Sequence, residues 1–163
     1  MKLGWRAPLL FSLLTGCATT PGMVGLKGDG SPGPEPCPKK ALENMALLRI
    51  HPGHMAWVDL DQSKIGQHNF TINDGPIESI LREPLGPSVL EGGTRLYGRV
   101  WTSGPDLVIR YYEARPEDAG GPIAICAVAR LDDGQLKKKP GPAPGCAVIE
   151  HDVAAVVIVD GFR

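Results

Sequence analysis

Short runs of alternating apolar and polar residues, separated by turn-forming residues, limit most strongly what this chain can fold into. A period of two residues is typical of β-strands with one buried face, and Gly, Pro, Asn and Asp between such runs are typical of turns. Seven runs of this kind lie beyond residue 50, at 55–60, 67–72, 77–81, 95–102, 106–113, 122–131 and 153–159. They predict a mainly β fold, a small antiparallel β-sandwich or barrel, with one N-terminal helix.

The residues between these strands indicate which of them pair. Ser103-Gly104-Pro105 predicts a hairpin of the two strands that it joins. The two strands that flank residues 61–66 could also pair with each other. The last strand, Val153–Val159, is apolar on both faces, which favours a central place in the sheet.

One helix is predicted, over residues 37–48. Pro38 suits the first helical position, where a missing N–H costs nothing. Leu42, Met45 and Ala46 then recur at the spacing of one helical face. The segment His51-Pro52-Gly53 ends the helix.

Residues 18–36 are dense in Gly and Pro and show neither helical nor strand periodicity. Such a segment offers too little apolar surface to offset the entropy lost on ordering. Nineteen residues reach about 60–70 Å when fully extended and span about 25 Å as a flexible coil. We therefore expect a flexible tether between the N-terminal segment and a folded domain.

The first residues have the pattern of a secretory signal. Lys2 and Arg6 precede the apolar stretch Ala7–Leu14, which is too short to span a bilayer as a helix. The following Leu14-Thr15-Gly16-Cys17 resembles the bacterial lipobox, which implies cleavage after Gly16 and lipidation of Cys17. Several acyl chains would anchor the protein firmly. By the same resemblance, Ala18 after the cysteine implies the outer membrane, on its periplasmic or cell-surface side.

These features predict three parts of the chain. Residues 1–16 are the expected signal peptide, residues 17–36 the lipidated cysteine with its tether, and residues 37–163 a β-rich globular domain. Loss of Lys2 and Arg6 with the signal peptide leaves 15 basic groups against 18 acidic ones, a net charge of −3. Nucleic acid is therefore not an expected partner, because binding phosphates requires a basic surface.

The remaining cysteines are odd in number: Cys37, Cys126 and Cys146. Export beyond the cytoplasm favours a disulfide. A Cys37–Cys126 bond would join the start of the helix to a strand, and a Cys126–Cys146 bond would join two strands. The third thiol would stay free.

Residues that could carry chemistry are few. His51 and His54 form an HxxH. Although Pro52 and Gly53 interrupt the helix that would align them, a metal-dependent hydrolase that uses both histidines with nearby carboxylates is an alternative function. Asp59 and Asp61 could form a carboxylate pair, although such pairs more often end a strand. Four aromatic residues on two adjacent strands could form a binding strip or pack across strands, and packing is the favoured interpretation: Tyr97, Trp101, Tyr111 and Tyr112. We assign no catalytic residue, metal or cofactor.

Short motifs in residues 36–163 resemble an uncharacterised family of myxobacterial lipoproteins. They are Cys37-Pro38, Asp74-Gly75-Pro76-Ile77, the run from Gly93 to Trp101, Arg110–Ala114 and Pro122–Cys126. The resemblance places cysteines at positions 37 and 126 and so implies a disulfide between them, with Cys146 as a free thiol. Members are often labelled as protein-kinase-associated, which implies a sensor accessory to a membrane kinase pathway.

Kinase activity itself is not expected, because the chain contains no glycine-rich phosphate loop, HRD-type loop or DFG. The sequence predicts an envelope lipoprotein with a non-enzymatic binding or scaffolding domain. Its expected partners are the membrane, through the lipid, and an unidentified envelope protein. The hydrolase using His51 and His54 and the kinase-pathway sensor remain the alternatives.

Overall fold

The computed structural model describes residues 24–87, 90–118, 120–131 and 134–163. Within these residues the chain is mainly β with one α-helix, as predicted. Cys17 and the expected signal peptide lie outside them. No helix in the described ranges has both the length and the apolar character needed to cross a membrane.

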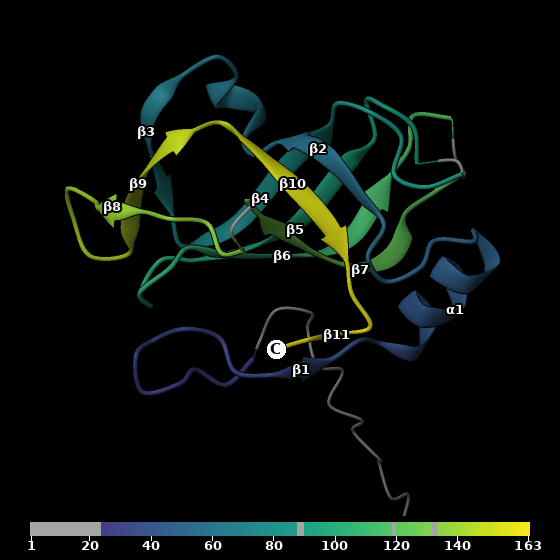
Figure 1. Cartoon of the computed structure of the whole chain (residues 1–163), viewed down its shortest axis with the longest axis horizontal. Helices are drawn as coiled ribbons and strands as arrows, with labels where there is room; N and C mark the ends of the chain where they lie inside the picture. The colour runs from purple at the N-terminus through teal and green to yellow at the C-terminus, as the bar shows by residue number, and fades with distance from the viewer. Residues whose placement is uncertain (1–23, 88–89, 119, 132–133) are drawn as a thin grey trace, which may run out of the picture.

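Six antiparallel strands close into a barrel in the order β10-β2-β4-β5-β6-β7 (Figure 1). Their bounds are β2 Met55–Asp59, β4 Gly75–Leu81, β5 Arg95–Trp101, β6 Val108–Arg115, β7 Ile123–Arg130 and β10 Val153–Ile158. Pairing of β10 with β2 on one side and β7 on the other closes the ring. Of the two predicted architectures the barrel is therefore the observed one, and β10 is paired on both edges, as its apolar character predicted.

Alternate residues of each strand fill the barrel interior, because successive side chains of a strand point to opposite faces. Ala154, Val156 and Ile158 of β10 are buried there. The hydroxyl of the buried Tyr111 lies 2.7 Å from that of Ser79, which donates to a backbone oxygen of Leu60. The polar atoms of this core are thus hydrogen-bonded, as buried polar groups must be to avoid a desolvation cost.

Two irregularities of register bend the strands around the small barrel. They lie between Tyr97 and Gly98 of β5 and between Tyr111 and Glu113 of β6. Gly98 is required at the first of them, since a Cβ there would collide with the carbonyl oxygen of Arg110 and lie 2.9 Å from the Tyr111 ring. The predicted β5–β6 hairpin is confirmed.

A second sheet, in the order β3-β9-β8, lies at one end of the barrel (left in Figure 1). Its strands are β3 His68–Asn73, β9 Cys146–His151 and β8 Lys139–Pro140. The expected pairing of the strands that flank residues 61–66 is wrong, because β3 pairs with β9, while β2 pairs with β10 and β4. The chain runs from β3 into β4 and from β9 into β10. Although β3 and β9 pair with each other, β4 and β10 do not, because β2 lies between them and pairs with both.

Helix α1, Lys39–Leu47, lies at the other end and packs on β7 (right in Figure 1). Its buried residues are Ala41 and Met45, whereas Leu42 is 40% exposed. The predicted helix is confirmed, but its buried face is rotated from the predicted one. The side-chain amide of Asn44 donates to the carbonyl oxygen of Ala124 on β7, 3.2 Å away.

The described part of the expected tether, residues 24–36, is packed against the barrel instead of hanging free. A turn is closed by a bridge between Leu26 and Pro32 and a hydrogen bond from Gly33 to Gly25. Strand β1, Glu35–Pro36, then pairs with β11, Gly161–Phe162, below the barrel in Figure 1. We call residues 24–36 together with β11 the strap. The prediction failed because its Gly and Pro composition shows no periodicity, while its partners lie at the far end of the sequence.

Candidate functional site

Arg110, on the outer face of β6, holds the strap to the barrel. It is only 1% exposed, and its guanidinium donates to the carbonyl oxygen of Gly33 at 2.8 Å and to the Glu35 carboxylate at 3.4 Å. The same guanidinium lies 4.9 Å from the ring centre of Phe162 and 5.5 Å from that of Trp101. Contacts of a cation with aromatic faces are favourable, and more so when desolvated. One side chain thus joins the strap to the barrel.

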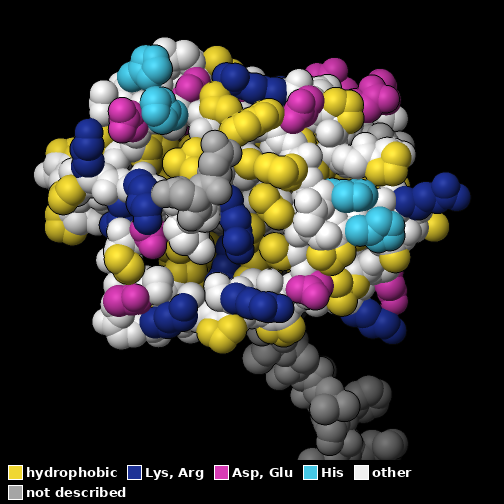
Figure 2. Space-filling view, in the orientation of Figure 1, with side chains coloured by type: hydrophobic (Ala, Val, Ile, Leu, Met, Phe, Trp, Pro, Cys, Tyr) yellow, Lys and Arg dark blue, Asp and Glu magenta, His cyan; other side chains and the backbone are white. Residues whose placement is uncertain are grey.

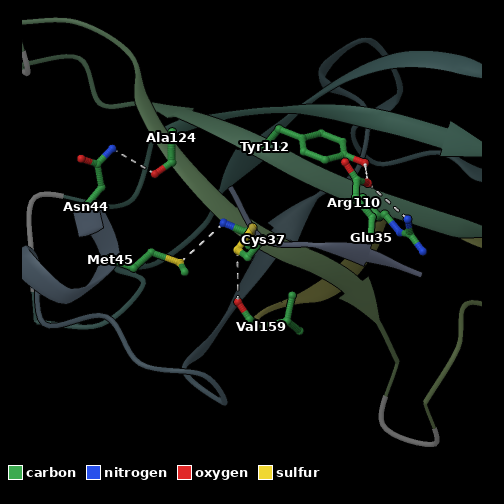
Figure 3. Close-up of a disulfide and its surroundings, with 9 residues drawn as sticks. Glu35, Cys37, Asn44, Met45, Arg110, Tyr112, Ala124 and Val159 are labelled. Carbon is green, nitrogen blue, oxygen red and sulfur yellow. Dashed lines mark hydrogen bonds and ion pairs between the residues drawn. A yellow bond between two sulfur atoms is a disulfide. The ribbon is translucent and has the colours of Figure 1, made fainter. Parts of the chain in front are cut away.

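Tyr112, also on β6, completes this contact. Its hydroxyl donates to Glu35 at 2.9 Å (Figure 3). Its ring packs on Phe162, with the ring centroids 5.2 Å apart. Burial raises the pKa of Tyr112 well above its ordinary value, and the hydrogen bond and charge of Glu35 add to the effect. The phenol therefore stays protonated and keeps donating to the carboxylate.

Beside the strap lies a groove with a volume of about 420 Å³. Its floor is the outer face of β6 and β7, and its walls are the strap, the chain before β6 and the C-terminal residues. The lining residues on which the argument below depends are Lys27, Asp29, Asp106, Arg110, Val128, Arg130, Gln135, Asp160 and Arg163. We refer to this space as the groove.

Several of the charges in the groove are already paired. Asp106 is 3.4 Å from the ammonium group of Lys137. Asp29 accepts from the hydroxyl and backbone N–H of Ser31, which lower its pKa. Arg110 is held by the strap. Among the described residues, by contrast, the buried Nε of Arg130 has no hydrogen-bond partner.

An unpartnered buried guanidinium nitrogen favours an anionic ligand. Guanidinium groups bind carboxylates and phosphates through two parallel hydrogen bonds, and Arg163 and Lys27 add positive charge to the same lining. Arg99, next to Arg110 across β5 and β6, has the same unpartnered Nε within the described part of the chain, although it does not line the groove. Four basic side chains line the groove against three acidic ones, Asp29, Asp106 and Asp160, and the buried Nε of Arg130 is the point at which it could accept an acidic group.

Within the described residues, His51 and His54, the histidines of the hydrolase alternative, are not brought together with further metal ligands. His51 and His54 lie edge to face with ring centroids 5.4 Å apart, and Nδ1 of His54 accepts from the backbone N–H of His51. Across β3 and β9, His68 and His151 form a second such pair at 5.9 Å. In the described ranges of the chain, no three His, Cys, Asp or Glu side chains form a group that could hold a metal ion. The hydrolase alternative therefore gains no support from the geometry.

The carboxylates of Asp59 and Asp61 have separate structural roles. Asp59 is buried and accepts from the Arg82 guanidinium at 2.6 and 2.8 Å. Asp61 caps the 3₁₀ turn η1, Gln62–Lys64, by accepting from the backbone and hydroxyl of Ser63. The alternative interpretation, that this pair ends a strand, fits the structure better than a catalytic pair.

The four aromatic side chains of β5 and β6 do not form an open strip. Tyr111 points into the barrel core, and Trp101 is buried. Tyr112 lies against Phe162 of the strap, and Tyr97 lies beside the guanidinium of Arg115, 4.4 Å from its ring centre. The four side chains are thus packed, as the favoured interpretation has it, but Tyr112 packs on Phe162 of β11 and not across β5 and β6.

The disulfide predicted between Cys37 and Cys126 is present, with Cα atoms 6.0 Å apart (Figure 3). It joins the chain just before α1 to the middle of β7, and Met45 packs beside it, its sulfur accepting from the backbone of Cys126. Cys146 is a free, half-buried thiol that donates to the carbonyl oxygen of Ala143. The alternative Cys126–Cys146 pairing is not formed.

Sequence reasoning missed the groove, since it is built from segments that lie far apart along the chain. Arg110 and Arg130 were present in predicted strands, and their outward positions follow from strand alternation. Their partners in the strap could not be found without its position. No family model, curated protein or solved structure matches the chain.

Proposed function

We propose that this chain is a lipid-anchored envelope protein whose barrel binds an acidic partner in the groove beside the strap, without catalysing a reaction. The observation that carries the binding proposal is the buried Nε of Arg130, which has no hydrogen-bond partner among the described residues and lies in a groove that other cations also line. The proposed anchor is Cys17, on the strength of the lipobox-like sequence before it.

The barrel suits binding because its shape is fixed before any ligand arrives. The ring of strands is closed, the disulfide joins α1 to β7, and Arg110 holds the strap in place. A preformed site loses less entropy on binding than one that must order itself. The partner we propose presents one or more carboxylates or phosphates on its surface; the family resemblance adds the hypothesis that this partner belongs to a membrane kinase pathway.

Site-specific photo-crosslinking in intact cells tests the binding proposal. A photoreactive residue replaces Gln135, which is exposed in the groove, and in a control it replaces Leu47, which is 83% exposed on α1. We expect a discrete adduct from position 135 only, and loss of that adduct when Arg130→Glu is added. The same adducts from both positions, none from position 135, or an adduct indifferent to Arg130→Glu would overturn the proposal.

A further inference from the structure

The outer face of the barrel next to the groove is apolar across three strands. On β10, Ala155 lies between Trp57 of β2 and Arg130 of β7, and Val157 lies between Met55 and Val128 of the same two strands. Met55 is 56% and Trp57 40% exposed. Figure 2 shows hydrophobic side chains gathered over β10 and its neighbours. We call Met55, Trp57, Val128, Ala155 and Val157 the apolar face. Ala155 is only 2% exposed, so the other four side chains make its accessible part.

The position of the strap shortens the expected tether. Only residues 18–23 separate Cys17 from Val24, where the described chain begins. Six residues reach about 20 Å even when fully extended. A barrel attached in this way cannot move far from the surface that holds its anchor.

The strap, in which the described chain begins, lies across the groove from the apolar face. Lys27, three residues after Val24, lines the groove together with Val128, which belongs to the apolar face, and with Arg130 at its border. Leu26, which lies between Val24 and Lys27 in the sequence, is 60% exposed. The strap and the apolar face therefore border the same groove.

The chemistry of the face fits the surface of a bilayer. Tryptophan prefers the level of the lipid headgroups, and arginine side chains there bind phosphates. Arg130 borders the face on one side and Arg82 on the other, where its backbone N–H donates to the Trp57 carbonyl oxygen. Of the nearby acids, Asp59 is paired with Arg82, whereas the exposed Glu83 accepts from the backbone N–H of Trp57 and keeps its negative charge.

We infer that the apolar face lies on the phospholipid bilayer that holds the anchor, with Trp57 at headgroup depth and the groove opening beside the membrane. This inference rests on the anchoring at Cys17 proposed above. It adds a second contact with the membrane, made by the barrel itself.

Tryptophan fluorescence tests this contact directly. Without its signal peptide the chain keeps two tryptophans, the exposed Trp57 and the buried Trp101, so the second is an internal control. The mature lipidated protein is reconstituted in vesicles of phosphatidylethanolamine and phosphatidylglycerol that carry a spin-labelled phosphatidylcholine quencher. We expect the tryptophan emission of the wild type to shift to shorter wavelength and to be quenched by the spin label. Both changes should be lost in Trp57→Phe, which retains only Trp101.

The possible results separate the two proposals. If the protein floats with the vesicles but wild type and Trp57→Phe are quenched equally, the membrane contact is refuted and the anchoring stands. If the protein isolated from cells does not float with vesicles at all, the anchoring fails and the membrane contact with it. Met55→Glu should reduce the quenching of Trp57, whereas Leu47→Glu, at a still more exposed apolar position on α1, should leave it unchanged. Equal effects of the two substitutions would also refute the contact.

Discussion

Arg110 is the side chain on which the arrangement of the strap depends most. It is buried between the barrel and the strap and is held by a carboxylate, a carbonyl oxygen and two aromatic rings. Removing one member of such a buried pair leaves the other desolvated and unpaired. We expect Arg110→Ala to lower the free energy of unfolding by about 3–5 kcal/mol, measured by chemical denaturation.

Arg115→Ala is the matched control for that substitution. Arg115 also lies on β6 and pairs with a carboxylate, Glu113, but its side chain is 53% exposed. Exposed pairs contribute at most about 1 kcal/mol. Similar losses from the two substitutions would show that Arg110 does not hold the strap.

Gly98 tests the bulge that bends β5. A methyl group there would overlap the backbone of Arg110 on the neighbouring strand. We expect Gly98→Ala to destabilise the protein by about 1–3 kcal/mol. Gly120→Ala is the control, because an added Cβ there would meet nothing within 4 Å, and it should be close to neutral in the same denaturation experiment. A neutral Gly98→Ala would contradict the close approach of β5 and β6.

Two tyrosines should make the fold sensitive to alkali. Burial raises the pKa of both Tyr111 and Tyr112. Because the folded state holds these protons more tightly than the unfolded chain, their effect on stability is absent below the ordinary tyrosine pKa, about 10, and stability falls as the pH rises above it. Tyr112→Phe should make this fall shallower in denaturation curves measured across that range, and an unchanged slope would contradict the burial of the phenol.

At the scale of whole elements, sequence patterns predicted the six barrel strands and the helix. Most of them bury one face and so show its period, and β10 stood out as a β-branched run that is apolar on both faces. They did not predict β9, whose start follows the Gly- and Pro-rich residues 140–145. Nor did they predict β1 and β11, each of two residues and too short to show a period. Pairing across residues 61–66 was wrong because neighbours in sequence were assumed to be neighbours in the sheet.

The disulfide joins the helix to the barrel and closes a loop of 89 residues. Its effect on the entropy of the unfolded chain corresponds to about 4–5 kcal/mol for a loop of this size. We expect Cys37→Ser with Cys126→Ser to lose stability on this scale, while Cys146→Ser changes little. Mass spectrometry of unreduced peptides gives an independent check: a peptide linking residues 126 and 146 would contradict the observed pairing.

The strap should open as a unit when its aromatic contact is lost. Phe162 is 2% exposed and touches both Arg110 and Tyr112. We expect Phe162→Ala to speed hydrogen exchange in residues 26–36 while exchange in β5 stays slow, since the barrel closes without the strap. Equal acceleration in both regions would show that strap and barrel unfold together.

At the scale of the whole molecule, the proposed function depends on how close the fold holds the barrel to the membrane. The proposal of a binding domain held close to an anchor depends on three features of the described residues: the closed barrel, the strap packed on it, and the buried Nε of Arg130 that has no hydrogen-bond partner among them. The outward arginines could be found from strand alternation, whereas the groove depends on contacts between the two ends of the chain, which no local pattern reveals.

Metabolic labelling with a palmitate analogue tests the anchoring most directly, because both the proposed function and the membrane contact depend on it. The full chain is expressed in a bacterium with lipoprotein-processing enzymes and compared with Cys17→Ser and, as a second cysteine control, Cys146→Ser. We expect label in the wild type and in Cys146→Ser and none in Cys17→Ser. Equal labelling of the wild type and Cys17→Ser, or label in neither, would contradict lipidation at Cys17.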